Sequence, residues 1–279
     1  MTYLEQPPSP PLQRYVEAFW QLEAPVSPAK STQEKILPDG CIEIIFNLAE
    51  RFQRFHANGV IERQPSVLVV GQMRQHVCIA PTGSVRLFAI RFKPSGAFPF
   101  LRVPLHELTD RILSAEMVQR DFTRELEERL HSVRSFAESI RQAETVLVRR
   151  IQTEEDRAVE LLAERIVASQ GRLSVVQLAH DIGLSTRQLE RRFQTHVGIS
   201  PKLLARIIRF QKIFAAVEQN VESWSGVALS CGYYDQAHLI HDFKAFSGQN
   251  PSSFLLEQTA MSAHLMRKNR MSFFYKTKS

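Results

Sequence analysis

The 279-residue sequence has few cysteines, and none belongs to a paired motif. The three residues Cys41, Cys78 and Cys231 lie far apart, and no CxxC pair occurs. This spacing argues against a disulfide framework or a structural zinc site and favours a reducing compartment. No apolar run approaches roughly 18 residues, so we expect no membrane-spanning helix. The N-terminus has neither the basic nor the apolar region of a signal peptide, which predicts a cytoplasmic protein.

Motifs of common enzyme classes are also lacking. The chain has no GxGxxG, P-loop, GxSxG or HExxH pattern, and these patterns mark phosphate-binding loops, nucleophiles and zinc sites. His56, His76, Cys41 and Cys78 occur in a strand-rich region, but no two have ligand spacing such as HxH or CxxC. We therefore expect no catalytic residue, no cofactor and no metal site, and a protein that is not an enzyme.

What the sequence does contain is a helix-turn-helix pattern at residues 174–200. Gly183 ends the first helix, because glycine adopts the left-handed conformation at little cost. Ser185 and Gln188 then have the spacing of a capping box, which starts the second helix. That helix buries one face and leaves the other polar, as a helix in a DNA major groove requires. The polar face carries Arg187, Arg191 and Gln194.

The pattern occurs twice, and residues 223–250 form the second copy. Ala179 and Gly183 recur 49 residues later as Ala228 and Gly232. Leu189, Phe193, Gly198 and Pro201 recur 50 residues later as Leu239, Phe243, Gly248 and Pro251. One extra residue in the turn explains the change of offset, and Asp235 replaces Ser185 as the helix cap. A repeat at constant offset predicts two copies of one structural unit.

Positive charge is concentrated in the repeated half of the chain. Residues 171–279 contain 14 Lys and Arg against 7 Asp and Glu, whereas residues 1–170 contain 21 against 22. The formal net charge of +6 therefore comes from the half where contacts with phosphate would use it. A merely solvated positive surface would give the same imbalance, so charge alone leaves that alternative open.

The N-terminal half has the signals of short strands. Apolar, β-branched or aromatic stretches at 41–48, 66–73, 76–80 and 84–92 are bounded by turn residues. We expect a small antiparallel β-sandwich or barrel whose core includes Trp20, Phe46, Phe88 and Phe92. Residues 1–12 are proline-rich and predicted to be extended, and residues 105–113 are predicted to form a first short helix.

The remaining segments are predicted to be helices. Residues 121–152 are amphipathic and could pack on their own domain or on a partner copy. A long apolar helix begins at Ser200-Pro201 and should pack against both repeat units. The predicted fold is α+β, with a β-rich domain followed by an all-α domain. Its expected segments are a β-rich regulatory domain (1–113), a helical connection (114–153), a DNA-binding domain (154–258) and a basic tail (259–279).

Residues 155–257 closely resemble the DNA-binding region of the AraC/XylS family of bacterial transcription regulators. The resemblance is carried by Leu178-Ala179, Gly183-Leu184-Ser185, Leu189-Glu190-Arg191-Arg192-Phe193, Gly198-Ile199-Ser200-Pro201, Val227-Ala228, Cys231-Gly232-Tyr233, Asp235-Gln236, His238-Leu239, Phe243-Lys244, Phe246, Gly248 and Asn250-Pro251. It implies two recognition helices in successive major grooves of one DNA face, joined by a long helix. It also implies contact with RNA polymerase in a role such as that of an activator.

Carried over by position, the resemblance gives the residues that face DNA. They are Thr186, Arg187, Glu190, Arg191 and Gln194 in the first unit and Gln236, Ala237, Ile240, His241 and Lys244 in the second. Ser200, Lys202, Ser252 and Ser253 lie near helix N-termini and are candidates for phosphate contact. The N-terminal domain, with its Pro38-Asp39-Gly40-Cys41 turn and the stretch Arg102-Val103-Pro104-Leu105-His106-Glu107-Leu108-Thr109-Asp110, is similar to sensor domains that bind an effector or form homodimers.

Each of these assignments has a plainer alternative. Arg187 and Arg191 could lie on a solvated helix face or pair with Glu190, and the serines could act only as helix caps. His196 and His238 lie near the buried side and are more typical of packed histidines. The repeat as a whole could be a helical protein-interaction module, or the chain a ligand-binding protein without sequence-specific DNA binding. Salt-sensitive binding to duplex DNA would separate these functions.

Overall fold

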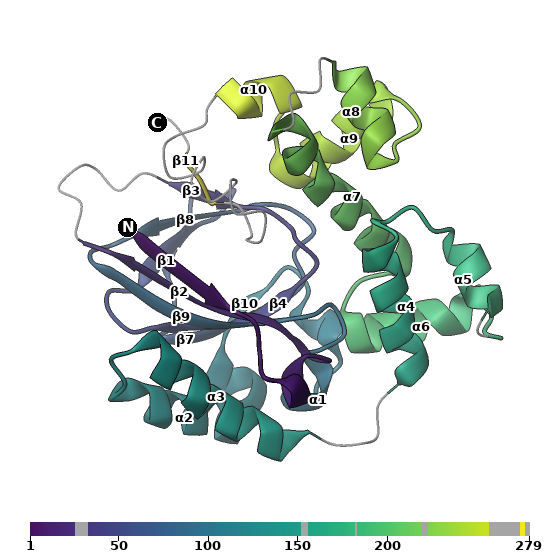
Figure 1. Ribbon diagram of the computed structural model, residues 1–279. Helices are drawn as coiled ribbons and strands as arrows, with labels where there is room; N and C mark the ends of the chain where they lie inside the picture. The colour runs from purple at the N-terminus through teal and green to yellow at the C-terminus, as the bar shows by residue number, and fades with distance from the viewer. Residues whose placement is uncertain (26–32, 152–155, 182, 219–222, 257–273, 277–279) are drawn as a thin grey trace.

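The computed structural model describes residues 1–25, 33–151, 156–181, 183–218, 223–256 and 274–276. Antiparallel strands form the N-terminal part, and helices form the part that contains the repeat (Figure 1). The predicted α+β fold class is therefore confirmed. Within the described residues, no helix is both long enough and apolar enough to cross a membrane.

The described strands form two sheets that face each other around an apolar interior (Figure 1). The six-stranded sheet has the order β1 (Thr2–Gln6), β2 (Val16–Ala24), β9 (Val85–Phe92), β4 (Ile42–Asn47), β7 (Val67–Val70) and β10 (Ile112–Ser114). The five-stranded sheet has the order β11 (Phe274–Lys276), β3 (Glu34–Ile36), β8 (Val77–Pro81), β5 (Phe52–Phe55) and β6 (Ile61–Arg63).

Strands β4 and β9 lie side by side at the centre of the larger sheet, and both of their faces are buried. In β9, Phe88, Ile90 and Phe92 belong to the core on the outer face, whereas Leu87 and Ala89 face the second sheet. This alternation follows from the two-residue period of a strand. Arg91 therefore points into the space between the sheets, and its partner in register on β4 is Glu43.

Helices cover the outer face of the larger sheet. They are α1 (Phe98–Leu101), α2 (Ala115–His131, with a break at Gln119) and α3 (Phe136–Arg150), together with the short 3-10 helices η1 (Pro10–Leu12) and η2 (Leu105–Leu108). Phe122, Leu126 and Ile140 lie in one apolar core with Phe88 of β9. The segment 114–153, expected to connect two domains, thus packs on the sheet of its own domain over α2 and α3.

Two other local predictions were only partly right. Residues 2–6 are extended as predicted and pair with β2, but residues 10–12 form the short helix η1. Residues 105–113 do not form one helix: the short helix η2 ends at Leu108, and Ile112 already pairs with Val70 as part of β10. Asp110 has a positive φ of 60°, so the chain turns away from the helical path there.

The C-terminal domain is helical. Its elements are α4 (Arg157–Ala168), α5 (Val175–Asp181), α6 (Thr186–Val197), α7 (Pro201–Glu218), α8 (Trp224–Cys231), α9 (Gln236–Ser247) and α10 (Pro251–Leu256). As predicted, α7 joins the two repeat units and is buried between them through Leu204, Phe210 and Phe214. The expected basic tail 259–279 lies outside the described residues except for β11, which pairs with β3.

Candidate nucleic-acid interface and cavity

The first repeat unit consists of α5 and α6, and its sequence explains both ends of α6. Ser185 accepts a hydrogen bond from the amide of Gln188, and the Gln188 side chain accepts one from the amide of Ser185, which is the predicted capping box. Gly198 ends the helix with a φ of 95°. Leu189, Phe193 and Val197 are buried, so the opposite face is left to solvent.

That face carries every residue predicted for DNA contact in the first unit. The side chains of Thr186, Arg187, Glu190, Arg191 and Gln194 are all exposed. In the described part of the chain, Arg187 and Arg191 have no ion pair, so neither is neutralised by Glu190. The adjacent Arg192 is different, because its guanidinium pairs with Asp156 at the start of α4. The structure thus leaves two guanidiniums of α6 available and uses the third for packing.

The second unit consists of α8 and α9 and is capped in the same way. Ser223 and Asp235 accept hydrogen bonds from the amides of Gly226 and His238, and Gly248 ends α9 in the left-handed conformation. Gln236, Ala237, His241 and Lys244 are exposed, as expected for the face that contacts DNA. We call this face of α6 and of α9 the reading face, and the two helices the reading helices. Ile240, which is also predicted for this face, is half-buried and packs against the core of the domain.

Three of the histidines of the repeat, His196, His238 and His241, occupy different settings. His241 is 76 % exposed, with its Nδ1 3.5 Å from Oδ1 of the buried Asp242. His238 was expected near the buried side, but its side chain is 42 % exposed and lies edge-on to Tyr233. His196 is half-buried and packs against Phe98 of the N-terminal domain, with 4.3 Å between ring centroids. Of the three, His241 alone combines a place on the reading face with high exposure.

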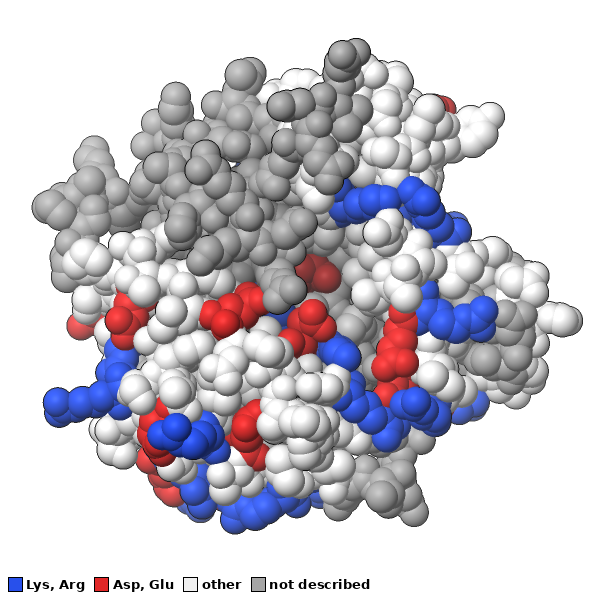
Figure 2. Space-filling view, viewed as in Figure 1, with Lys and Arg blue, Asp and Glu red and all other residues white. Residues whose placement is uncertain are grey.

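The four predicted phosphate contacts are only partly free. Ser200 accepts a hydrogen bond from the amide of Leu203, so it acts as a helix cap. Ser252 accepts one from Nε1 of Trp224 at 3.1 Å. Ser253 and Lys202 are exposed, and the part of the chain described here offers neither side chain a partner. Figure 2 shows further Lys and Arg side chains on the helical domain, at the upper right.

Helix α7 sets the position of the two units relative to each other. Arg206 of α7 forms an ion pair with Asp242 of α9 at 2.7 Å. Three residues on, Arg209 donates to the carbonyl of Gly171, which precedes the first unit, at 2.6 Å. One helix therefore holds both units, so a displacement of α7 would act on both reading helices.

The N-terminal domain contacts each reading helix at the glycine that ends it. Thr109 donates through Oγ1 to the carbonyl of Gly198 at 2.6 Å, and the amide of His76 donates to the carbonyl of Phe246 at 2.9 Å. A Cβ at Gly198 would lie 2.9 Å from the carbonyl oxygen of Leu105, and one at Gly248 would lie 2.6 Å from Cε1 of His76. Both glycines have a positive φ, 95° at Gly198 and 77° at Gly248, and both lie against the N-terminal domain, so the two units are held at equivalent points of the repeat.

A third contact joins the N-terminal domain to α7 through residues 37–40, which we call the 37–40 loop. Leu37 is 2 % exposed and belongs to the apolar core of the helical domain. The carbonyl of Pro38 accepts a hydrogen bond from Gln211 of α7, and that of Gly40 accepts one from Gln72 at 2.8 Å. The loop is therefore part of the domain interface.

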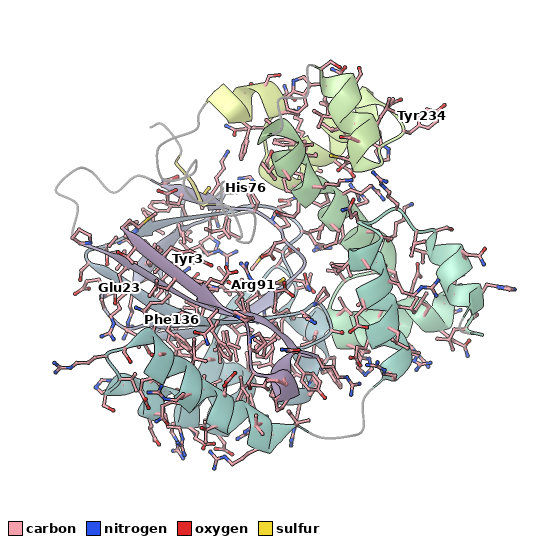
Figure 3. All side chains as sticks on the ribbon, in the orientation of Figure 1. Tyr3, Glu23, His76, Arg91, Phe136 and Tyr234 are labelled. Atoms are coloured by element: carbon pink, nitrogen blue, oxygen red, sulfur yellow. The ribbon has the colours of Figure 1, made fainter. Side chains whose placement is uncertain are left out.

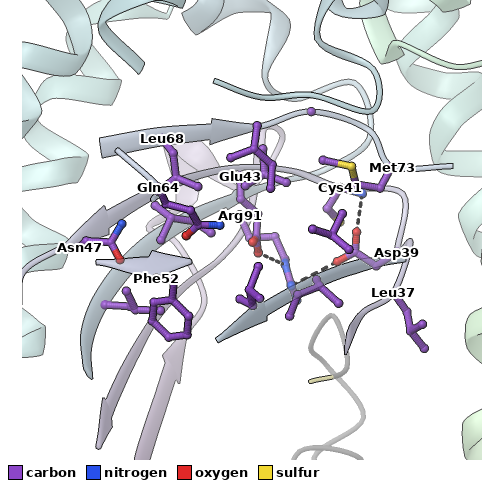
Figure 4. A pocket seen from close by; sticks show the side chains of 18 of the residues that line it. Leu37, Asp39, Cys41, Glu43, Asn47, Phe52, Gln64, Leu68, Met73 and Arg91 are labelled. Carbon is purple, nitrogen blue, oxygen red and sulfur yellow. Dashed lines mark hydrogen bonds and ion pairs between the residues drawn. The ribbon is translucent and has the colours of Figure 1, made fainter. Parts of the chain in front are cut away.

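The same loop borders a cavity between the two sheets (Figures 3 and 4). The cavity encloses about 760 Å³ of space free of protein atoms, part of it open to solvent. Arg91, 4 % exposed, forms an ion pair with Glu43 at 2.7 Å and with Asp39 of the 37–40 loop at 3.2 Å. Asp39 thus lies between the cavity and α7. Among the described residues, no group of three or more His, Cys, Asp or Glu residues could hold a metal ion.

The sequence did not point to Glu43, Arg91 or Asp39 as site residues. The available signal was a charged residue at an inward position of an otherwise apolar strand: Glu43 within IEIIF and Arg91 within FAIRF. Such a residue must be paired when both faces of the strand are buried. Asp39 was assigned only to a turn, because nothing in the sequence places that turn beside β9.

Comparisons with known proteins divide the chain in the same way. Residues 178–257 match the family described as a helix-turn-helix domain, and residues 4–114 match the family described as a domain of unknown function, DUF6597. A Haemophilus influenzae protein, described as an uncharacterized HTH-type transcriptional regulator, is 31 % identical over 80 residues. The match spans 29 % of this chain and 27 % of that protein.

Solved structures of ToxT from Vibrio cholerae are also similar. One from strain O395 has a TM-score of 0.47 and 11 % identity, with 85 % of this chain and 97 % of that chain covered. Another, from strain SCE256 with an unsaturated fatty acid bound, has a TM-score of 0.46 and 12 % identity, with 91 % and 95 % covered. Residues 178–257, which contain most of the doubled unit, are thus an AraC-type helix-turn-helix domain, and residues 4–114 match a separate family.

Proposed function

We propose that this protein is a sequence-specific DNA-binding transcription regulator that acts by binding and not by catalysis. The observation that carries the proposal is the matched exposure of three side chains on each of two equivalent helices. Positions 187, 191 and 194 hold Arg, Arg and Gln, and positions 237, 241 and 244 hold Ala, His and Lys. All six are exposed, while the other face of each helix is buried.

The dimensions of the domain support simultaneous reading by both units. Helix α7 has 18 residues and is therefore about 27 Å long, which is of the same order as one turn of B-DNA. With one unit packed near each end of this helix, the two reading helices can enter successive major grooves of one DNA face. Arg187 and Arg191 have the geometry for bidentate contact with guanine.

We further propose that the N-terminal domain controls this binding through a small effector in the cavity. The support is that one short loop contacts both the cavity and the helical domain. Asp39 lines the cavity, and its neighbours Leu37 and Pro38 contact the helical domain. A ligand that changed the position of Asp39 would act on α7 and through it on both units. Self-association and contact with RNA polymerase, which the family resemblance implies, remain predictions.

The salt dependence of binding tests the DNA-binding role. A site obtained by selection from random duplexes should bind the purified protein, and raising salt from about 50 to 200 mM should weaken binding on the order of a thousandfold or more, for roughly 6–10 phosphate contacts. Fluorescence anisotropy with the selected duplex and a scrambled control measures both the sequence preference and the salt dependence of binding. Equal affinity for the two duplexes, or a flat salt dependence, would support the protein-interaction alternative.

A further inference from the structure

Two cations from distant parts of the chain meet at one backbone carbonyl of the second unit. Arg172, which lies between α4 and α5 just before the first unit, donates from its guanidinium to the carbonyl of Ser230 in α8. Lys212 of α7 donates from Nζ to the same carbonyl at 2.8 Å. Because both charged nitrogens are within hydrogen-bonding distance of one oxygen, the two positive charges lie close together. Burial raises the pKa of the Cys231 thiol, next in the chain, and both cations oppose that rise.

Neither cation has an acidic partner in the part of the chain that the structure describes. Arg172 and Lys212 form no ion pair there, so no carboxylate neutralises their charges. Arg172 is exposed and Lys212 is half-buried. A guanidinium has five N–H groups and an ammonium has three, so each cation keeps donors that the carbonyl does not use. Two like charges this close repel each other, and an anion that bridges them would remove the repulsion.

Capping of α8 accounts for only part of this arrangement. Cations near the last carbonyls stabilise the C-terminus of a helix, and Ser230 lies in the last turn of α8, which ends at Gly232. Arg172 also packs directly over this turn, since a Cβ at Gly232 would lie 3.0 Å from its Cγ. One donor would satisfy the Ser230 carbonyl, however, and the second adds like-charge repulsion. The pair therefore exceeds what the helix end requires.

A third cation lies beside this pair. Arg209 and Lys212 are three residues apart in α7, so they lie on one side of the helix. Arg209 donates to the carbonyl of Gly171, the residue before Arg172, and its guanidinium lies over the ring of Tyr233. Figure 2 shows Lys and Arg side chains gathered where the unit of α8 and α9 meets the unit of α5 and α6. Positive charge is thus concentrated between the two units.

This region is where a DNA backbone would pass. When two reading helices enter successive major grooves of one DNA face, the backbones that border the intervening minor groove lie between the units. Arg172 precedes the first unit, Ser230 belongs to the second, and Lys212 comes from the helix that joins them. The cluster is therefore built from both halves of the repeat, at the place where phosphate lies closest to both.

We propose that Arg172 and Lys212 form a phosphate-binding site between the two units, in which one phosphodiester of the DNA backbone bridges the guanidinium and the ammonium. This inference rests on the proposed DNA-binding function and adds to it a contact that carries no base preference. Contacts with phosphate fix the register and orientation of a protein on the duplex. Because both units contribute to this site, the bound phosphate positions the two reading helices relative to the same stretch of DNA.

Anisotropy titrations of the full-length protein with the selected and scrambled duplexes, at several salt concentrations, test the site. Arg172→Met and Lys212→Met remove the charge and keep an apolar stem. We expect each to weaken binding to both duplexes about five- to tenfold and to reduce the salt slope by about 1. Lys212→Arg keeps the charge and should retain the slope of the unaltered protein. Arg157→Met is the matched control: it removes a cation of the same domain that is paired with Glu160, and should leave the slope unchanged.

The outcomes separate the inference from the proposed function. If both Met variants unfold more easily but keep the unaltered slope, the two cations only cap α8, and the inference is overturned while the selected duplex is still preferred. A loss confined to the selected duplex would also overturn it, since the site would then read bases. If the unaltered protein binds both duplexes equally but the Met variants have the reduced slope, the phosphate site is supported and sequence-specific binding is refuted.

Discussion

The two repeat units place opposite charges at the same position. Residue 192 of α6 is an arginine that pairs with Asp156 on α4, whereas residue 242 of α9 is an aspartate that pairs with Arg206 on α7. Both side chains lie on the inner side of a reading helix and tie it to a neighbouring helix. The equivalent residues therefore both anchor a reading helix, but they carry charges of opposite sign.

The two anchors also differ in burial. Asp242 is 1 % exposed and Arg206 28 %, whereas Asp156 is 10 % exposed and Arg192 35 %. The ion pair that fixes the second unit to α7 is thus the more buried of the two, chiefly through its carboxylate. The reading faces differ as well. The first offers Arg187 and Arg191, which form no ion pair with any described residue, whereas the second offers Ala237, His241 and Lys244.

The largest effect should come from breaking the buried anchor. Arg206→Met leaves the buried Asp242 carboxylate without its guanidinium, so we expect the free energy of unfolding to fall by about 3 kcal/mol. Arg192→Met is the matched comparison and should cost less, about 1 kcal/mol, because both members of this pair are more exposed than their counterparts in the second unit. Urea unfolding followed by circular dichroism measures both. Equal losses would mean that the two anchors do not differ as their burial indicates.

The second test concerns base discrimination. Arg191→Ala should lower the affinity for the best site by about 1–3 kcal/mol and relax preference at one base pair, since a guanidinium can read guanine through two hydrogen bonds. His241→Ala alters the equivalent position of the second unit and should change specificity less. The affinities of both variants for a panel of duplexes with single-base changes show which unit contributes more to specificity. A uniform loss in Arg191→Ala together with relaxed specificity in His241→Ala would reverse the roles of the units.

Lys244 gives a smaller and different effect. Its ammonium is a flexible point charge near the end of α9, which suits a phosphate better than a base edge. Lys244→Ala should weaken binding to all sequences about equally and reduce the salt slope by about 1. Gln194→Ala, at the equivalent position of α6, should leave the salt slope unchanged because it removes no charge. A salt slope that is the same in Lys244→Ala and the unaltered protein would place this lysine away from the DNA.

Local sequence patterns were sufficient for the repeat. The capping box at Ser185 and Gln188, the caps at Asp235 and Ser200, and the start of α7 are local interactions that depend on a few neighbouring residues. The apolar period also predicted the buried residues of α6 and α9, which include Leu189, Phe193, Leu239 and Phe243. Ile240 is half-buried because the apolar core extends further around α9 than a single buried stripe implies.

Contacts between distant segments could not be predicted from local sequence patterns. Glu43 and Arg91 meet only because β4 and β9 are adjacent in the sheet, with a separation of 48 residues in the chain. Leu37 belongs by sequence to the β-rich half, yet it completes the core of the helical domain. Likewise, Ile112 follows a short helix but becomes a strand because the edge of β7 is available for pairing. Such outcomes depend on the tertiary fold and have no local pattern.

The smallest effect should appear at the anchor of the first unit and should depend on pH. Burial acts to raise the pKa of Asp156, but hydrogen bonds from Arg192 and the amide of Val159 outweigh it, so the pKa is lowered. A lowered pKa stabilises the fold above the unfolded value of about 3.9, and this contribution is lost as pH falls through the lower folded value. Asp156→Asn retains an N-cap but no charge, and should cost about 0.5 kcal/mol at neutral pH. The unfolding free energies of variant and unaltered protein should therefore converge in acid, as urea titrations from pH 7 downward would reveal. A difference that persists undiminished at the lowest pH would show that the cap geometry, and not the ion pair with Arg192, anchors this unit.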